Sequence, residues 1–308
     1  MPLRLAFFDD PLLRLTPPSG LDDPFDSKPA QAEIMKTFSV FFAEQAGFEE
    51  ADADTKAIRG ADERELGKGL DQFGIISLSE DPYNLLMWSH YAAEHTGVVM
   101  SIKCDCSTFA HHYPFTERGG VSAVEPVRVR YSNVRPGYQM PGCTRYEYVE
   151  HHLSTHFAMI KGIDWSYEKE HRYLLRLTEA DVVIAQVNVA GWETGQGSDV
   201  CITHLYDKTF KIQTSGAEKR DVLFRILALA QGRGDISNVM YFKRLKRNAI
   251  TGIYFGSRVK GEDMLAVREK IESNSLLAGS ISFYKSIESP DKFEVAFKKL
   301  DARLPSRS

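Results

Sequence analysis

The chain has 308 residues, of which 43% are hydrophobic and 26% are charged, and its formal net charge is −4. Such a chain can bury a full hydrophobic core, so we expect a single globular domain over residues 1–308. The slightly acidic balance excludes a whole-protein attraction to phosphate backbones or anionic membranes, although it is compatible with local basic patches.

The sequence also predicts the cellular compartment. No segment reaches the run of roughly 18 apolar residues that spans a bilayer, and the opening "MPLRLAFFDDPLLRL" breaks into Asp-Asp-Pro too early for a secretory signal. The four cysteines do not form a small-domain disulfide framework in a chain of this length. We therefore expect a cytoplasmic protein with free thiols and no membrane partner.

One short stretch, "CDCSTFAHH" (104–112), places two thiols near two imidazoles. Structural zinc sites use CxxC-type spacings with a second, distant pair of ligands, and the sequence has neither. The stretch is therefore predicted to be an ordinary exit from a strand into a loop, and no metal is expected.

The N-terminal part is predicted to contain short strands and then a helix. "RLAFF" and "LLRL" have strand composition, and the turn-rich "TPPSGLDDPFD" (16–26) follows them. Residues 30–47 predict a helix, because large apolar side chains recur there at helical spacing. The stretch near residues 48–70 is acidic and poor in large apolar side chains, so it is predicted to be a mobile connection or a short surface helix.

A predicted strand over 73–80 leads into a helix. Asp81 has a side chain suited to capping, and Pro82 follows it at the first helical position. The helix is expected to run to about His95, with Gly97 as its C-terminal stop.

The remaining elements mix strands and helices. Further strands are predicted at 97–104, 127–132, 172–177, 181–190 and 198–207, with a closing pair in "SISFYKSI" and "FEVAFKKL". Helices are predicted at 144–162, 218–232 and 262–273. Because strands dominate and the helices are interspersed irregularly, strict βαβ alternation fails. We expect an α+β fold with a mixed, largely antiparallel sheet core.

The first cluster of chemically interesting residues is "MWSHYAAEHTG" (87–97). Leu85, Trp88 and Ala92 share one helical stripe, which predicts that Trp88 faces the core with its indole nitrogen bonded to a partner. Tyr91 lies beside this stripe and His90 lies off it. For Ser89, His90 and Tyr91, a structural role and a role in a site both remain open.

The second cluster is "DWSYEKEHRYLLRL" (164–177). An extended chain would place Glu168, Glu170 and Arg172 on one face, whereas a helix would make Glu168 and Arg172 an i, i+4 pair. Either arrangement is compatible with a plain ion-pair network. The functional hypothesis is that one glutamate binds a hydroxyl or stabilises a developing positive charge, as carboxylates do at glycosidic carbons.

Two weaker features lie in the C-terminal third. The apolar strand in "AITGIYFGSRV" (249–259) breaks at Gly256, a geometry that can bring backbone N–H groups to a phosphate. "KRLKR" (243–247) has four positive charges in five residues, which indicates a solvated surface or a nucleic-acid contact. The sequence contains no GxSxG, P-loop, HExxH, GxGxxG or kinase signature.

Four blocks resemble, in order, a prokaryotic family catalogued as domain of unknown function 2971. They are "LRLTPPSGLDDPFD" (13–26), "GIISLSEDPYNLLMWSHYAAEHTGVVMSI" (74–102), "WSYEKEHRYL" (165–174) and "ITGIYFGSRVKGEDMLAVREKI" (250–271). The opening of this family looks like that of remote ADP-ribosyltransferase folds. In those folds a first-strand His or Arg holds the NAD ribose, an aromatic residue stacks on nicotinamide, and a late Glu contacts the ribose 2′-hydroxyl.

The resemblance implies roles for particular residues. Tyr91 or Trp88 would form the aromatic platform for NAD, Ser89 belongs to the same cofactor-binding set, and His90 belongs to the catalytic set. Glu170 would be the catalytic glutamate, Arg172 would orient it, and Glu168 completes an E-x-E like that of one transferase subgroup. The family's opening strand and helix are shortened here to "MPLRLAFFDDP", which leaves Arg4 as the candidate that holds the ribose.

Three functions are weighed on this basis. The first is an ADP-ribosyltransferase-like enzyme that cleaves the nicotinamide–ribose bond of NAD and modifies a macromolecule, a protein or a nucleic acid, as a toxin or anti-phage effector. The second is a non-catalytic binding module that recognises its partner through loops 48–70 and 105–125. The third is a metal-dependent nuclease using the carboxylates Asp22, Asp23, Asp26, Glu168 and Glu170.

Overall fold

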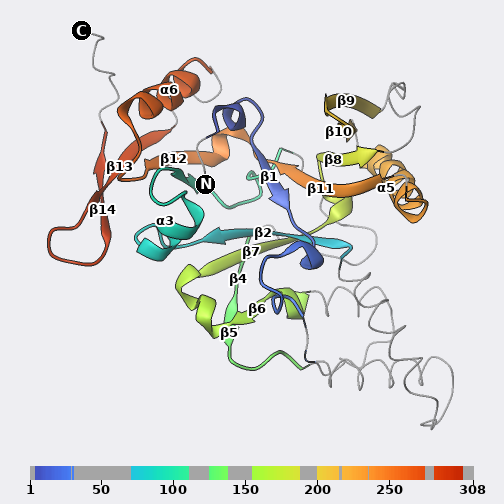
Figure 1. The fold of residues 1–308 in the computed structure, drawn as a ribbon, viewed down its shortest axis with the longest axis horizontal. Helices are drawn as coiled ribbons and strands as arrows, with labels where there is room; N and C mark the ends of the chain where they lie inside the picture. The colour runs from blue at the N-terminus through green and yellow to red at the C-terminus, as the bar shows by residue number, and fades with distance from the viewer. Residues whose placement is uncertain are drawn as a thin grey trace.

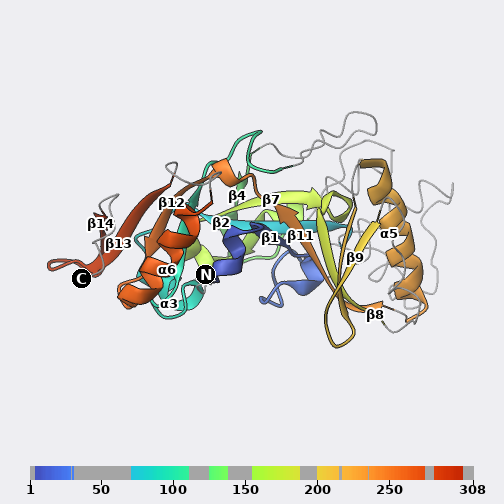
Figure 2. The same cartoon turned by 90° about the horizontal axis from the view of Figure 1, so that it is seen from above.

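The computed structural model describes residues 4–28, 30, 71–110, 125–137, 155–187, 200–214, 217–234, 236–274 and 281–300. The predicted mobile connection near residues 48–70 and nearly all of the predicted helix at 30–47 lie outside the described residues. Within the described part, three sheets lie side by side along the longest axis of the molecule (Figures 1 and 2).

A five-stranded antiparallel sheet forms one end of the molecule. Its order is β1 (Leu12–Leu15), β11 (Ile236–Arg244), β8 (Val182–Val187), β10 (Thr209–Thr214) and β9 (Val200–Tyr206). Helix α5 (Ala217–Gly232) lies against this sheet (Figure 1). Leu223, Leu227 and Ala230 are buried at helical spacing, which confirms the amphipathic helix predicted from the sequence.

A four-stranded sheet forms the other end, in the order β14 (Val295–Lys299), β13 (Ser282–Glu288), β12 (Ile250–Phe255) and β3 (Val98–Ile102). β12 and β13 are parallel and the other pairs are antiparallel. Helix α6 (Gly261–Glu272) connects β12 to the segment before β13 and lies beside them in both views (Figures 1 and 2). The closing strand pair is thereby confirmed.

A three-stranded antiparallel sheet lies between these two, with β2 (Phe73–Ser79), β7 (Glu170–Arg176) and β4 (Val127–Arg128) in that order. It meets β1 through a bridge between Thr16 and Ile75. The contact is close, because a Cβ built on Gly74 would lie 2.3 Å from Leu15 Cγ. Glycine at position 74 therefore allows the two sheets to meet.

A fourth, small sheet pairs β5 (Arg130–Ser132) with β6 (Ile160–Gly162) in parallel, and the 3-10 turn η3 (Ile163–Glu168) follows at once. The remaining 3-10 turns described are η1 (Leu5–Phe8), η2 (Pro18–Gly20), η4 (Leu177–Glu179) and η6 (Arg247–Ala249). The strand predicted for "RLAFF" was wrong, because η1 occupies this segment. Of the helix predicted over 144–162, the structure describes residues 155–162; residues 155–158 are helical and the helix ends earlier than predicted, because β6 begins at Ile160.

Helix α3 (Leu85–Tyr91) is shorter than predicted at both ends. Its N-cap is Asn84, whose Oδ1 accepts hydrogen bonds from the backbone N–H groups of Leu86 and Met87. Asp81 instead closes a turn by accepting from Tyr83 N–H. The prediction of Asp81 as the cap was wrong, because the proline signal marks this turn and the helix begins one turn later.

The segment after α3 turns sharply before β3. Ala93, Glu94 and His95 all have positive φ angles of 48°, 52° and 68°. The chain then passes close to Gly256, whose N–H donates to Gly97 O at 3.0 Å and on which a Cβ would lie 2.0 Å from His95 O. The prediction that backbone N–H groups at this break meet a phosphate is not supported at Gly256, Arg258 and Val259, because the N–H groups of all three bond to carbonyl oxygens of the chain. The glycine instead permits a close backbone contact.

The fold class is α+β with mostly antiparallel sheets, as predicted. The described cysteines Cys104, Cys106 and Cys201 are free thiols, also as predicted. Among the described residues, no helix combines the length and the apolar character needed to cross a membrane.

Candidate functional site

The two residue clusters singled out in the sequence meet at one place. The Tyr91 hydroxyl, at the C-terminal end of α3, donates a hydrogen bond of 2.5 Å to Glu168 Oε1 at the end of η3. Asn84 joins the same elements at the other end of α3, because its Nδ2 donates to Tyr167 O at 3.0 Å. The helix and the 3-10 turn are therefore held together by polar side chains.

The backbone around Glu168 explains why this carboxylate lies here. η3 is followed by Lys169, which adopts a left-handed conformation with φ 45° and ψ 51° before β7 begins at Glu170. Ser79 in β2 donates a hydrogen bond of 2.7 Å to Glu168 O and so attaches the turn to the sheet. The segment is a 3-10 turn up to Glu168 and a strand from Glu170, so the extended arrangement is correct for Glu170 and Arg172 but not for Glu168, and the helical pairing of Glu168 with Arg172 is wrong.

Lys161 in β6 is the central cation of this site. Its Nζ lies 2.6 Å from Glu168 Oε2, 3.3 Å from Glu170 Oε2 and 3.8 Å from Asp26 Oδ2. Only 9% of its side chain is exposed. Burial alone would lower the pKa of Lys161, but the negative charges of Glu170, Glu168 and Asp26 outweigh it and raise that pKa. Lys161 is thus a charged ammonium between three carboxylates.

Arg172 in β7 is fully buried and completes the network. Its guanidinium makes two hydrogen bonds to Glu170, of 2.7 and 2.9 Å, and two to Asp26, of 2.8 and 2.5 Å. Ala158 O accepts another at 2.6 Å. Burial opposes the charge, yet the hydrogen bonds that Arg172 donates to Asp26 and Glu170 prevail and raise the pKa of Arg172. Each nitrogen of the Arg172 guanidinium therefore bonds to a protein group.

An open cavity of about 920 Å³ lies beside the network. Its walls come from the loop at 22–25, the end of α3, the segment after β5, and β6 with η3. The aromatic residues on its walls are Phe25, His90, Tyr91, Trp165 and Tyr167. Cavities of roughly 300–1,000 Å³ are typical of small-molecule sites.

The rings on the cavity wall contact one another and nearby cations. His90 lies 6.2 Å from Tyr167 between ring centroids, and Tyr167 lies 6.1 Å from Trp165. Lys161 Nζ is 4.9 Å from the centre of the Trp165 ring, a cation–π distance. At the rim, the Arg135 guanidinium lies 4.6 Å above the Phe25 ring. The cavity therefore combines aromatic faces with two cations, Lys161 and Arg135, and its lining also contains the carboxylates Asp22, Asp23 and Asp164.

Tyr91 is the residue that connects the cavity with the buried network. It lines the cavity, 46% of its surface is exposed, and its hydroxyl binds Glu168. Partial burial, together with the Glu168 carboxylate, raises the pKa of Tyr91 well above its usual range. The phenol is therefore protonated at neutral pH and acts as a hydrogen-bond donor.

The other predicted site residues have different positions. Trp88 is 1% exposed and its indole nitrogen donates to Pro82 O at 2.7 Å, which confirms its role in the core. Ser89 is exposed on α3, and Arg4 is exposed next to η1; neither lines the cavity. Glu168 and Glu170 are 4% and 2% exposed and lie behind the cavity wall.

Sequence reasoning missed Lys161 and Arg135, and it considered Asp26 solely as a metal ligand. "MIKG" around Lys161 contains no recognisable motif, so no sequence signal distinguishes this lysine. In the part of the chain that the structure describes, no group of three or more His, Cys, Asp or Glu residues could hold a metal ion. Lys161 and Arg172 instead occupy the space between the carboxylates.

Fold and site together define an α+β protein with a buried ion-pair network behind an aromatic-lined cavity. Residues 87–173 match the family model described as protein of unknown function (DUF2971). The matched region begins on α3 and ends in β7, so it contains both Tyr91 and Glu168. Comparisons with curated proteins and with solved structures gave no match.

Proposed function

We propose that the chain is an ADP-ribosyltransferase-like enzyme that cleaves the nicotinamide–ribose bond of NAD and transfers ADP-ribose to a macromolecule. The observation that carries this proposal is the hydrogen bond between Tyr91 and Glu168 at the wall of the aromatic-lined cavity. It brings together a flat ring and a carboxylate. These are groups that can position a nicotinamide and stabilise a cationic ribose.

The size of the cavity and its aromatic rings support NAD as the co-substrate. The rings of Tyr91, Trp165 and Tyr167 offer faces on which nicotinamide or adenine can stack. Arg135 at the rim can hold a diphosphate, because a guanidinium pairs two N–H groups with two phosphate oxygens.

In the proposed reaction the ribose C1′–N bond breaks and its electron pair leaves with nicotinamide. The remaining oxocarbenium ion is stabilised by the negative charge of Glu168. A nucleophilic oxygen or nitrogen of the acceptor then bonds to C1′ and releases its proton. Tyr91 and Lys161 each hold one oxygen of Glu168, which orients the carboxylate toward the cavity wall.

Glu168 replaces Glu170 as our choice for the catalytic carboxylate. Both carboxylates have both oxygens bound, but Glu168 binds the cavity-lining Tyr91. Both oxygens of Glu170 are instead bound by the fully buried Arg172, and Lys161 binds one of them as well. We assign Glu170 and Arg172 as positioning residues, which act by holding Lys161 and the start of β7 in place.

The test is the release of nicotinamide from NAD by the purified protein, measured by chromatography with and without protein and nucleic-acid acceptors. Glu168→Gln should lower the release rate at least about 100-fold, the scale lost when an electrostatic stabiliser is removed. Trp88→Phe is the matched control, because it removes a core hydrogen bond away from the cavity. It should lower the melting temperature without a selective loss of rate.

Two results would overturn the proposal. One is no release by the wild-type protein with any acceptor, and the other is unchanged release by Glu168→Gln. Glu170→Gln should lower both the melting temperature and the rate, since it removes a charge from the buried network.

A non-catalytic binding module is the second candidate, and the burial of Glu168 and Glu170 favours it. A purely structural network needs no access to a ligand. In that case no nicotinamide would be released, whether or not NAD binds in the cavity. Glu168→Gln and Glu170→Gln would then lower the melting temperature and have no other effect. The nuclease hypothesis has no such support, because cations already fill the space between the carboxylates.

A further inference from the structure

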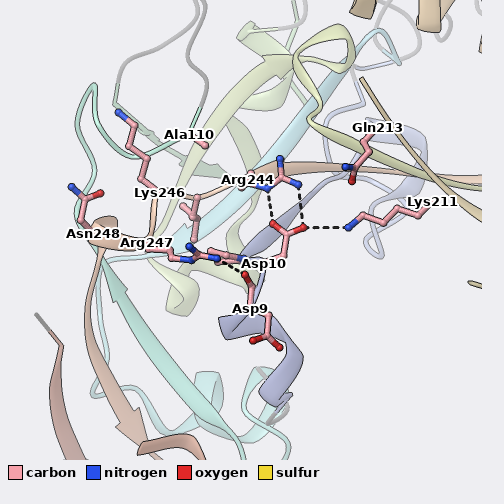
Figure 3. Close-up of a pocket in the computed structure, with 11 residues that line it drawn as sticks. Asp9, Asp10, Ala110, Lys211, Gln213, Arg244, Lys246, Arg247 and Asn248 are labelled. Atoms are coloured by element: carbon pink, nitrogen blue, oxygen red, sulfur yellow. Dashed lines mark hydrogen bonds and ion pairs between the residues drawn. The ribbon is translucent and has the colours of Figure 1, made fainter. Parts of the chain in front are cut away.

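A second cavity, of about 700 Å³, shares no lining residue with the first (Figure 3). It lies where β11 runs into η6, next to β10 and the segment that precedes β1. The polar and charged residues on its walls are Asp9, Asp10, Lys211, Gln213, Arg244, Lys246, Arg247 and Asn248.

The "KRLKR" run supplies part of this cavity, and the structure divides its charges into two groups. Lys243 is fully buried, where its Nζ donates to Glu179 O at 2.7 Å and lies 3.7 Å from Asp181. Leu245 is also buried. Arg244, Lys246 and Arg247 face the cavity, so three of the four cations gather there.

One carboxylate in the cavity binds two cations. Asp10 receives hydrogen bonds from Arg244 Nε at 2.5 Å and from Arg244 Nη2 at 3.1 Å, and Lys211 Nζ lies 3.2 Å away (Figure 3). The hydrogen bond from Arg244 lowers the pKa of Asp10, so this group is ionised at neutral pH. The carboxylate occupies the guanidinium fork in the manner of a bound oxyanion.

The remaining positive charge is not balanced inside the cavity. Arg247 donates a hydrogen bond of 2.8 Å to Asp9 O, a neutral carbonyl, while the Asp9 carboxylate pairs with Lys270 at 2.6 Å. Lys246 extends away from the paired residues (Figure 3), and within the described part of the chain its ammonium has no hydrogen bond or ion pair. Two cations therefore remain available to an anionic ligand.

The lining also indicates which part of a ligand this cavity recognises. Side-chain amides of Gln213 and Asn248 add hydrogen-bond donors, whereas none of the described residues that line it is aromatic. Without a ring, a nucleobase has no stacking platform. Guanidinium and ammonium groups together are instead suited to phosphate oxygens.

We propose that this cavity is a phosphate-binding site that takes the phosphate groups of a diphosphate or a phosphodiester through Lys246, Arg247, Arg244 and Lys211. Asp10 acts as an internal competitor, because a phosphate entering the site must share Arg244 with it. The proposal is independent of NAD cleavage in the first cavity.

The test uses two probes with the full chain. Inorganic pyrophosphate is titrated by calorimetry, and a fluorescein-labelled single-stranded DNA of mixed sequence is followed by anisotropy at low and high salt. Lys246→Gln/Arg247→Gln should weaken binding at least tenfold. Lys298→Gln/Lys299→Gln is the matched control, because it removes two exposed charges from β14, whose residues line neither cavity.

The outcomes separate the sources of the phosphate. Pyrophosphate binding alone assigns a small phosphorylated ligand, whereas binding of both probes with strong salt dependence assigns a nucleic-acid backbone. The proposal is overturned if neither probe binds the wild-type protein, or if both double variants lose affinity equally.

Asp10→Asn provides a test with the opposite sign. Removing the internal carboxylate should tighten pyrophosphate binding severalfold, so pyrophosphate should raise the melting temperature of this variant more than that of the wild type. A smaller rise than in the wild type would contradict the role of Asp10 as a competitor. Should Asp10→Asn fail to fold, the double variant at 246 and 247, which leaves Asp10 untouched, decides the proposal alone.

Discussion

The hydroxyl of Tyr91 donates a 2.5 Å hydrogen bond to Glu168 Oε1, across 77 positions of the chain. This bond attaches the end of α3 to the end of η3 and marks the boundary between an open cavity and a buried ion-pair network. Each residue is also held by a second interaction. Tyr91 is part of helix α3, and Glu168 accepts a hydrogen bond from Lys161.

The first prediction concerns the strength of this bond. A hydrogen bond to a charged group contributes about 1.5–3 kcal/mol, but Tyr91 is nearly half exposed, so Tyr91→Phe should lower the free energy of unfolding by about 1–2 kcal/mol. Urea denaturation measures the change. The double variant with Glu168→Gln should be less destabilised than the sum of the single variants.

Tyr83→Phe is the matched control for that cycle. Tyr83 is also exposed, and within the described residues its hydroxyl has no hydrogen bond. Loss of the Tyr83 hydroxyl should change the free energy of unfolding by no more than about 0.5 kcal/mol. Strict additivity of Tyr91→Phe and Glu168→Gln would contradict the observed bond.

The second prediction concerns Arg172. Removing one partner of a buried ion pair leaves uncompensated charge and typically costs about 3–5 kcal/mol. Arg172→Met leaves Asp26 and Glu170 in that state, so the loss should fall in this range or prevent folding. The control is Arg128→Met, which breaks an exposed pair with Glu80 and should cost less than about 1 kcal/mol. If chemical denaturation gave the same loss in the free energy of unfolding for both variants, the buried network would contribute no more to stability than an exposed ion pair.

The third prediction is a pH dependence that originates at His95. Partial burial lowers the pKa of His95 below 6.5; Arg258 acts in the same direction, and Glu288 opposes it. Its Nδ1 is buried without a hydrogen-bond partner among the described residues. Because the unfolded chain binds the proton more readily, stability is complete above about pH 6.5 and falls as the pH decreases through the folded-state pKa.

His95→Asn should remove this effect. Asparagine tolerates the positive φ of 68° at this position. The melting temperature of the wild type should therefore decrease more steeply between about pH 7 and pH 5 than that of the variant. Parallel curves for the two proteins would rule out His95 as the source.

The fourth prediction concerns the backbone contact at Gly256. A methyl group there would lie 2.0 Å from His95 O, a backbone atom that cannot rotate away. Gly256→Ala should therefore destabilise the protein by about 1–3 kcal/mol or more, as overpacking does. Gly232→Ala is the control, since nothing lies within 4 Å of its Cβ position at the end of α5, and alanine there should be neutral or stabilising. A neutral Gly256→Ala would mean that the turn at 93–95 can move.

Several parts of the fold followed from local patterns. The stripe of Leu85, Trp88 and Ala92 predicted a buried tryptophan, and all three residues pack in one cluster with Val295. Helix α5 and the strand pair β13 and β14 were predicted in the same way, because the spacing of apolar residues along the chain indicates which side chains are buried together. Boundaries were less certain, as α3 shows, since Asp81 and Asn84 are both residues that cap a helix.

The candidate site was predictable in its components but not in its arrangement. Tyr91, Glu168, Glu170 and Arg172 all stood out by their chemistry. Glu170 and Arg172 share a face because residues two apart in a strand point the same way. Glu168 is brought to Tyr91 by the left-handed Lys169, a conformation that the sequence does not mark.

The sequence by itself determined the class of fold, the buried tryptophan and the identity of the residues that could carry chemistry, because these depend on side-chain type and local period. The tertiary structure decided that Tyr91 meets Glu168, that Lys161 and Asp26 join the network, and that Lys243 is buried while Lys246 lines a cavity. Those outcomes depend on contacts between residues far apart in the chain, where the burial of charge must be balanced by partners that no local pattern specifies.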